Sequence, residues 1–168
     1  MKIKVAAVQM VSGPDVDRNL EVADGLLAQA AKQGAKLALL PEYFCLMSGN
    51  DRDKLGIMEP DAGDWPMQAE AEVPLQCFLS DVARRYGMTV LGGTVPMRSP
   101  KINKVCNSLL VYGPDGRRLA RYDKIHLFGF QRGDESYDES VAIHPGRTPV
   151  VADVPVAGEA LRVGLSVC

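Results

Sequence analysis

A carboxylate that could act as a base follows one of the apolar, strand-like segments of this sequence. Glu42 comes after residues 36–40 and a proline, and Tyr43 and Phe44 stand next to it. Aromatic neighbours partly shield a carboxylate from water, which raises its pKa and makes it a usable base near neutral pH. From the local sequence alone, a glutamate that caps a helix or forms a salt bridge is the more common case.

A second candidate is Lys124, which ends the strand-like segment 117–123. Its ammonium could offset negative charge that develops on a reacting carbonyl oxygen. In isolation it could also be an ordinary solvated lysine. His126 has the chemistry of a general base, but a lone histidine between Ile125 and Leu127 is more often structural.

The third candidate is Cys168, which ends the apolar segment 161–167. A thiol held at the end of a strand can attack a carbonyl or nitrile carbon once it is deprotonated. The alternative is a buried, inert cysteine, and that is our interpretation of Cys45, Cys77 and Cys106.

The elements that would position these residues indicate an α/β fold. We expect a strand at about residues 2–9, a helix at about 17–33 and a strand at 36–40, the order of a parallel crossover unit. A second helix is expected to begin at Pro74 and to end before Gly87. Since ligands bind beyond the carboxyl ends of strands in open α/β sheets, Glu42 is well placed to face a ligand.

The remaining segments are shorter or irregular. Residues 46–73 and 129–148 are predicted to be loops. We expect the loop at 46–73 to overhang the site, because it leaves from the end of the second strand and long loops in compact domains are usually functional or mobile. Further strands are expected at residues 88–95, 105–112, 117–123, 150–154 and 161–167. A turn at 113–116 is expected to join the strands at 105–112 and 117–123 as a hairpin.

Composition limits the class of protein. The 168 residues are 46% hydrophobic and 24% charged, as expected for one globular domain, and the net charge is -2. No basic run favours nucleic acid or a membrane surface as a partner. No Cys or His spacing is typical of a metal site. No apolar run approaches the roughly 18 residues of a membrane span, and the start is too short for a signal peptide, so we expect a cytoplasmic protein.

The end of the sequence falls within a strand-like run, residues 161–168, with no exit turn. Natural chain ends are commonly polar and loosely held. We therefore expect residues 1–168 to form a single, truncated domain.

Three motifs occur in order at the ends of these segments. They are Leu-Pro-Glu-Tyr-Phe at 40–44, Tyr-Asp-Lys-Ile-His-Leu-Phe at 122–128 and Gly-Leu-Ser-Val-Cys at 164–168. With Val-Ala-Ala-Val-Gln-Met at 5–10, the sequence resembles the nitrilase, or carbon–nitrogen hydrolase, superfamily. Each motif alone is weak, but their order and spacing together make the resemblance specific.

The resemblance implies a role for each candidate residue. Glu42 would be the general base, Lys124 the cation that stabilises the oxyanion, and Cys168 the nucleophile. Glu139 would be the second glutamate, which positions Lys124 and the substrate; Glu135 is the less favoured alternative. The implied fold is a four-layer α-β-β-α sandwich, here without its carboxyl-terminal part, and the implied chemistry needs no metal and no organic cofactor.

The implied activity is hydrolysis of a small-molecule amide to a carboxylate and ammonia through a cysteine thioester. Residues 127–128 and 139–140 resemble the amidase branch that includes deaminated glutathione amidase and omega-amidase. The family resemblance also implies a homo-oligomer for a full-length protein.

Two other interpretations compete with an active amidase. In the family a turn and helix follow the cysteine, and here Cys168 would instead carry a terminal carboxylate, which opposes thiolate formation. We therefore expect residues 1–168 alone to be inactive or nearly so, and such a chain could act only as a binding or assembly module. A metal hydrolase would need clustered ligands, which the sequence lacks.

Overall fold

The centre of the molecule is one mixed β-sheet. The structure, a computed structural model, describes residues 2–66 and 71–168. The strands of the sheet are β1 (Val5–Ala7), β2 (Leu37–Leu39), β3 (Thr89–Leu91), β4 (Val95–Arg98), β5 (Val105–Tyr112) and β6 (Arg118–Asp123). The strands β1, β2 and β3 are parallel neighbours, and β5 pairs antiparallel with β3, β4 and β6.

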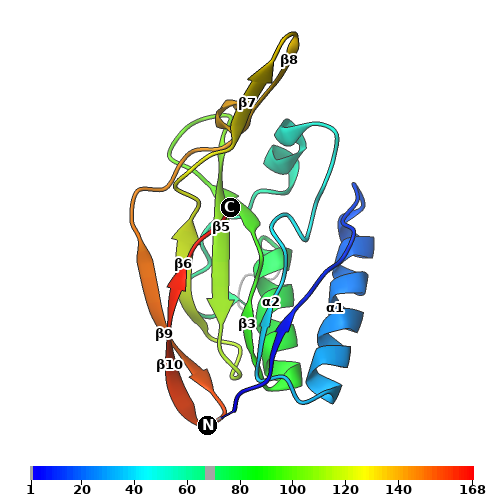
Figure 1. Ribbon diagram of the computed structural model, residues 1–168, viewed down its shortest axis with the longest axis vertical. Helices are drawn as coiled ribbons and strands as arrows, with labels where there is room; N and C mark the ends of the chain where they lie inside the picture. Colours follow the sequence, from blue (N-terminus) through cyan, green and yellow to red (C-terminus); the bar gives the residue numbers. More distant parts are fainter. Residues whose placement is uncertain (1, 67–70) are drawn as a thin grey trace.

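Helices and a second pair of strands cover the two faces of this sheet. The helices α1 (Val16–Lys32) and α2 (Pro74–Tyr86) lie on one side, and β9 (Val150–Val156) with β10 (Glu159–Leu165) lies on the other (Figure 1). A hairpin of β7 (Gly129–Arg132) and β8 (Glu135–Asp138) projects from one end of the molecule. Two 3-10 helices, η1 (Asp51–Ile57) and η3 (Glu139–Val141), complete the described elements.

The expected crossover unit is confirmed. The strands β1 and β2 are parallel, and α1 connects them. The side chain of Asp15 caps α1 by accepting a hydrogen bond of 3.0 Å from the backbone N–H of Arg18. Ala23 and Leu27, one helical turn apart, are buried against the sheet. The first strand is shorter than the predicted 2–9, because only Val5–Ala7 pairs with β2.

The second helix begins and ends as predicted. Pro74 occupies its first turn, and Gly87 ends it in the left-handed conformation with φ 58°. The buried carboxylate of Glu59 accepts the backbone N–H groups of Leu75 at 2.5 Å and Gln76 at 3.1 Å. A side chain far away in the sequence thus satisfies the free donors at the start of α2.

Of the helices in the described part of the chain, none is both long and apolar enough to span a bilayer.

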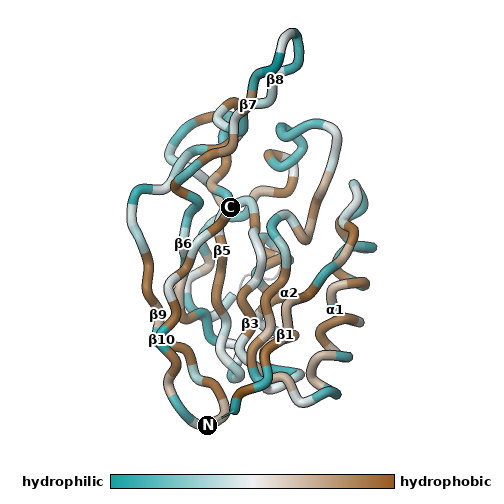
Figure 2. The backbone as a smooth tube through the Cα atoms, in the orientation of Figure 1, coloured by the Kyte–Doolittle hydropathy of each residue, from teal (hydrophilic) through white to brown (hydrophobic). Residues whose placement is uncertain are grey.

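Most of the apolar core lies in two layers, one on each face of the sheet, and Val105, Ala142 and Ile143 form a smaller third cluster. Figure 2 shows apolar residues concentrated along the central strands, while the tip of the β7–β8 hairpin is hydrophilic. The layer between the helices and the sheet includes Ala23, Leu27, Leu79, Val82, Val90 and Leu110. The layer between the sheet and the β9–β10 pair includes Leu91, Leu109, Val111, Val154 and Leu165.

The predicted strand 88–95 is wrong as a single element, because two glycines divide it into β3 and β4. A Cβ atom on Gly92 would lie 2.4 Å from the Leu79 side chain. One on Gly93, whose φ is +40°, would lie 2.1 Å from the carbonyl oxygen of Pro41. This close approach lets the turn that carries Glu42 rest against the break between the two strands.

The two predicted loops contain regular structure that the sequence analysis missed. Within residues 46–73, Asn50 caps η1 by accepting the backbone N–H of Arg52 at 3.0 Å. Within residues 129–148, the strands β7 and β8 form a hairpin and η3 follows directly. Both segments are short and polar, so neither has the apolar period from which elements are predicted.

The last strand, predicted at the apolar segment 161–167, is exposed for most of its length. The strands β9 and β10 form an antiparallel pair, and in β10 only Leu165 is buried, with Val163 half-buried. Alternate residues of β9, namely Ala152, Val154 and Val156, make most of the contact with the sheet instead. The predicted strand at 150–154 is therefore the buried member of the pair.

We predict that Glu59→Ala lowers the free energy of unfolding by about 2–3 kcal/mol, because two buried backbone donors lose a charged acceptor. Urea denaturation measures the change. Glu72→Ala is the matched control, since Glu72 lines the same cavity but is exposed, and it should change stability by less than about 0.5 kcal/mol. Equal losses in the two variants would contradict the capping role.

Candidate active site

A tight turn places Glu42 beyond the carboxyl end of β2. The backbone N–H of Leu40 still donates to the carbonyl of Leu91 at 3.0 Å, and the carbonyl of Pro41 then accepts the N–H of Phe44 at 3.2 Å. The chain thus leaves the sheet edge at Glu42, the edge where α/β folds bind ligands.

Lys124 is fixed through its backbone at the end of β6. Its N–H donates to the carbonyl of Asn107 at 2.9 Å, and its carbonyl accepts the N–H of Gly146 at 2.8 Å. A Cβ atom on Gly146 would lie 2.2 Å from the carbonyl oxygen of Asp123, so only glycine allows this approach. The lysine side chain extends inward, where its Nζ lies 2.9 Å from Oε1 of Glu42.

Glu139 reaches the same ammonium from η3. Its Oε2 lies 2.8 Å from Nζ of Lys124 and also accepts the backbone N–H of Phe128 at 2.8 Å. The N–H of Glu139 donates in return to the carbonyl of Phe128 at 3.0 Å. Glu135, the alternative second glutamate, is exposed in β8 and forms no ion pair with Lys124.

Two carboxylates therefore share one buried ammonium. The side chains of Lys124 and Glu139 are 1% and 4% exposed, and that of Glu42 is 25% exposed toward the cavity it lines. Burial by itself lowers the pKa of Lys124, but its hydrogen bonds and charge interactions with Glu139 and Glu42 outweigh burial and raise that pKa. The ammonium of Lys124 therefore stays charged at neutral pH.

Cys168 lies on the same cavity as Glu42. This cavity has a volume of about 240 Å³, and Gly93 and Thr94 also line it. Lys124 is not among the residues that line the cavity, but its Nζ contacts the carboxylate of Glu42, which is. No hydrogen bond within the described residues joins Cys168 to Glu42 or to Lys124. The apolar part of the lining is formed by Leu39, Leu40, Pro41, Leu109 and Val167.

The other residues considered from the sequence lie away from this cluster. His126 is exposed. Cys45, Cys77 and Cys106 are buried, as predicted. Burial raises the pKa of the Cys45 thiol to about 12 and that of Cys106 to about 11, which makes both poor nucleophiles at neutral pH.

Sequence reasoning missed two residues of the site. Asn107 donates its Nδ2–H to Oε1 of Glu42 at 2.7 Å. The sequence feature that could have revealed Asn107 is its polar carboxamide within β5, a strand whose eight residues are all buried. Tyr43 was considered only as a shield for Glu42, but its hydroxyl donates to Oε1 of Glu139 at 2.8 Å. No sequence pattern predicted that contact, because 96 residues separate the two partners.

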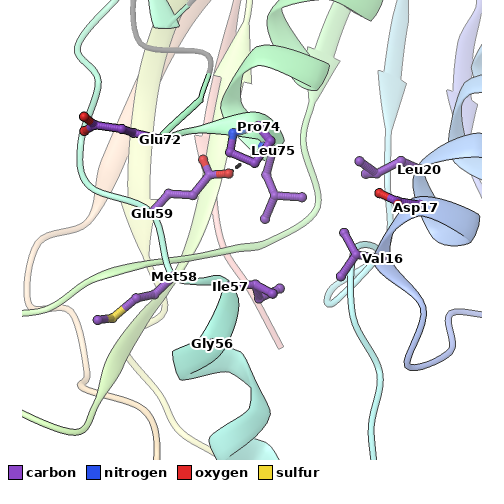
Figure 3. A pocket seen from close by; sticks show the side chains of 10 residues that line it. All are labelled: Val16, Asp17, Leu20, Gly56, Ile57, Met58, Glu59, Glu72, Pro74 and Leu75. Atoms are coloured by element: carbon purple, nitrogen blue, oxygen red, sulfur yellow. Dashed lines mark hydrogen bonds between the residues drawn. The ribbon is translucent and has the colours of Figure 1, made fainter.

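A second cavity, of about 290 Å³, lies between α1, η1 and the start of α2 (Figure 3). Three carboxylates, those of Asp17, Glu59 and Glu72, line it, but neither a thiol nor an ammonium does. The Glu59 carboxylate turns toward Leu75 and is used to cap α2. Outside residues 1 and 67–70, no group of three or more His, Cys, Asp or Glu side chains is arranged to hold a metal ion.

Comparison with known protein families identifies the family of this chain. The sequence model of the carbon–nitrogen hydrolase family matches residues 4–168. The chain belongs to this family. The match therefore extends over the segments that carry Glu42, Lys124, Glu139 and Cys168.

Curated and solved relatives of this carbon–nitrogen hydrolase include amidases. The chain is 33% identical to the chloroplastic omega-amidase of Arabidopsis thaliana, over 99% of the chain and 42% of the relative. It is 35% identical to a deaminated glutathione amidase of Synechocystis sp., over 97% of the chain and 56% of the relative. One solved relative is Saccharomyces cerevisiae Nit3, a member of branch 10 of the nitrilase superfamily. Its crystal structure superposes on this chain with a TM-score of 0.77 at 26% sequence identity, and the match covers 99% of this chain and 55% of Nit3.

The mixed α/β fold expected from the family resemblance is confirmed by the similarity to Nit3. This carbon–nitrogen hydrolase spans about half the length of the curated relatives it matches. Its described layers are the helical layer, the main sheet and the β9–β10 pair.

We predict that Lys124→Met lowers the free energy of unfolding by about 3–5 kcal/mol, because it leaves two carboxylates without their buried counter-charge. Urea denaturation of the variant and the unsubstituted chain at pH 7 measures this. Lys4→Met is the control, since the exposed Lys4 ammonium donates only to a backbone carbonyl. A loss no larger than in the control would contradict the role of the buried ammonium.

The stabilisation by Lys124 should also depend on pH in one direction. Its pKa is raised in the folded chain, so its charge contributes fully below the unfolded pKa of about 10.4 and the contribution is lost as the pH rises through the folded pKa. The difference in stability between the two chains should be constant from pH 7 to 9 and should shrink only at higher pH. A difference that disappears below pH 9 would contradict this.

Proposed function

We propose that the protein that carries this chain hydrolyses a small-molecule amide to a carboxylate and ammonia through a thioester on Cys168. The observation that carries the proposal is the shared cavity of Cys168 and Glu42, in which the carboxylate is held by the buried ammonium of Lys124. A carboxylate, an ammonium and a thiol at one sheet edge supply the base, the cation and the nucleophile of an acyl transfer.

The first half of the reaction forms the thioester. Glu42 accepts the proton of the Cys168 thiol, and the thiolate attacks the amide carbon. The electrons of the carbonyl bond move onto its oxygen, and the ammonium of Lys124 stabilises that oxyanion together with backbone N–H groups. When the oxyanion collapses, the carbon–nitrogen bond breaks, and Glu42 returns its proton to the leaving nitrogen, which departs as ammonia.

The second half of the reaction releases the acid. Glu42 accepts a proton from a water molecule, whose oxygen attacks the thioester carbon. Collapse of the second tetrahedral intermediate breaks the carbon–sulfur bond, and the proton held by Glu42 returns to the sulfur of Cys168. The products are the carboxylic acid and a thiol ready for the next cycle.

Two further residues keep Glu42 in place for both halves. Asn107 donates to the same Oε1 atom that faces Lys124, which leaves Oε2 for the proton of Cys168. Glu139 holds the other side of Lys124 and is in turn fixed to the backbone of Phe128. We assign both as supporting residues.

The relatives suggest the substrate class. Since they include an omega-amidase and a deaminated glutathione amidase, we propose a small amide whose leaving group is ammonia. Turnover of a panel of ω-amides, N-carbamoyl compounds and nitriles by the protein that carries this chain tests the proposal. Ammonia release from the ω-amides is expected to be fastest, and turnover of nitriles alone would overturn the choice of an amide.

We predict that Cys168→Ala reduces ammonia release to background, because no other thiol faces the cavity. Glu42→Gln should lower kcat by about three orders of magnitude, since an amide cannot accept the thiol proton. Steady-state assays measure both values. The control is Cys77→Ala, which removes a buried thiol of α2 and should retain normal turnover. Near-normal turnover in Glu42→Gln would remove the base assignment.

A second candidate function is a non-catalytic binding or assembly module, and it applies to residues 1–168 alone. The feature that favours it is the large exposed fraction of Cys168 and β10, which leaves the thiol without the water-excluded surroundings that acyl transfer needs. We predict no ammonia release from purified 1–168. Release that disappears in Cys168→Ala would show that these residues are a complete catalyst.

A further inference from the structure

Tyr43 adopts a backbone conformation that requires support. Its φ is +57°, in the left-handed region that residues with a side chain rarely adopt. Such a conformation persists only where the surrounding structure holds it, and it concentrates at functional sites. Tyr43 directly follows the general base Glu42, so whatever holds Tyr43 also sets the direction of the base.

Three contacts hold Tyr43, and each uses a different part of the residue. Its backbone N–H donates to Oγ1 of Thr94 at 2.8 Å. Its hydroxyl donates to Oε1 of Glu139 at 2.8 Å. The ammonium of Lys54 lies over its ring, 4.2 Å from the centroid, at the distance of a cation–π interaction.

The cation over the ring is itself fixed. Lys54 is 4% exposed and forms an ion pair with Asp51 of the same 3-10 helix, η1. The ammonium is therefore built into η1 rather than free in solvent. Burial and a hydrogen bond with Asp51 raise the pKa of Tyr137, a residue of β8.

The hydroxyl of Tyr43 acts on the carboxylate that holds Lys124. Oε1 of Glu139 accepts from the hydroxyl at 2.8 Å and from Nζ of Lys124 at 3.1 Å, while Oε2 faces Nζ at 2.8 Å. The hydroxyl therefore fixes the plane of this carboxylate relative to the ammonium. Without it, Oε1 keeps only its contact with Lys124, while the backbone N–H of Phe128 still holds Oε2, so the ammonium is less firmly aligned with Glu42.

We infer that Tyr43 is a positioning residue, which keeps the ammonium of Lys124 aligned with Glu42, and that Lys54 keeps Tyr43 in place. The Tyr43 hydroxyl is used by Glu139, which in turn binds Lys124, so its route to the reaction runs through Lys124. The inference rests on the proposed amide hydrolysis. Because misalignment affects the charged groups that act in the transition state, it should lower kcat and leave KM nearly unchanged.

The first test is Tyr43→Phe, which removes the hydroxyl and keeps the ring beneath Lys54. We expect kcat to fall about tenfold with KM within twofold, since one hydrogen bond to a charged group is lost. Tyr86→Phe is the matched control, because its hydroxyl also donates to a carboxylate, that of Asp24, but lies between α1 and α2. It should retain wild-type kcat. Thermal unfolding of both variants shows that each is folded.

The second test addresses Lys54. Lys54→Met keeps most of the length of the side chain and removes its charge, and we expect kcat to fall about fivefold. Lys54→Arg keeps a cation that can lie over the ring and should restore kcat to within twofold. Loss in the methionine variant with rescue by arginine supports the inference, whereas equal kcat in the two variants overturns the role of Lys54.

The outcomes separate this inference from the proposed function. If Cys168→Ala abolishes ammonia release but Tyr43→Phe retains kcat within twofold, the positioning role is wrong and the amidase proposal stands. If Cys168→Ala retains ammonia release, the proposed function itself fails. A tenfold fall in kcat for Tyr43→Phe with an equal fall for Tyr86→Phe would also overturn the positioning role, because the effect would not be specific to the site.

Discussion

The site depends on one buried ammonium shared by two carboxylates. An isolated charge inside a protein is strongly destabilising, so Lys124 is tolerated there only because Glu42 and Glu139 both bind it. The reverse also holds, since either carboxylate would repel the other without the lysine. The three side chains come from the ends of β2 and β6 and from η3. Because the three charged groups must contact one another, they fix how those three parts of the chain meet.

The surrounding backbone is built to permit this arrangement. Gly146 lies against the carbonyl of Asp123 and donates to Lys124, and Gly93 lies against the carbonyl of Pro41 next to Glu42. Each approach is too close for a Cβ atom. The glycines thus bring the strand ends close enough for charged side chains to pair, and the cavity shared by Glu42 and Cys168 lies where those strand ends meet.

Elements with a strong apolar period could be predicted from the sequence, and polar or strained ones could not. The crossover from β1 through α1 to β2, the helix α2 and the β5–β6 hairpin all follow from periodicity and turn residues. The division of 88–95 depends on contacts of Gly92 and Gly93 with distant residues, and η1 and the β7–β8 hairpin are short and mostly polar. Glu42, Lys124 and Glu139 were predicted from motifs, but Asn107 and the hydroxyl of Tyr43 enter through contacts that only the fold creates.

The most direct test of this account is a double-mutant cycle between Lys124 and Glu139, with Lys124→Met, Glu139→Gln and the combined variant measured by urea denaturation at neutral pH. If the ammonium and the carboxylate stabilise each other as the geometry indicates, the coupling free energy should be about 2 kcal/mol or more, because both groups are buried and in contact. A coupling below about 0.5 kcal/mol would mean that the two substitutions act independently, and it would contradict the central role of the shared ammonium.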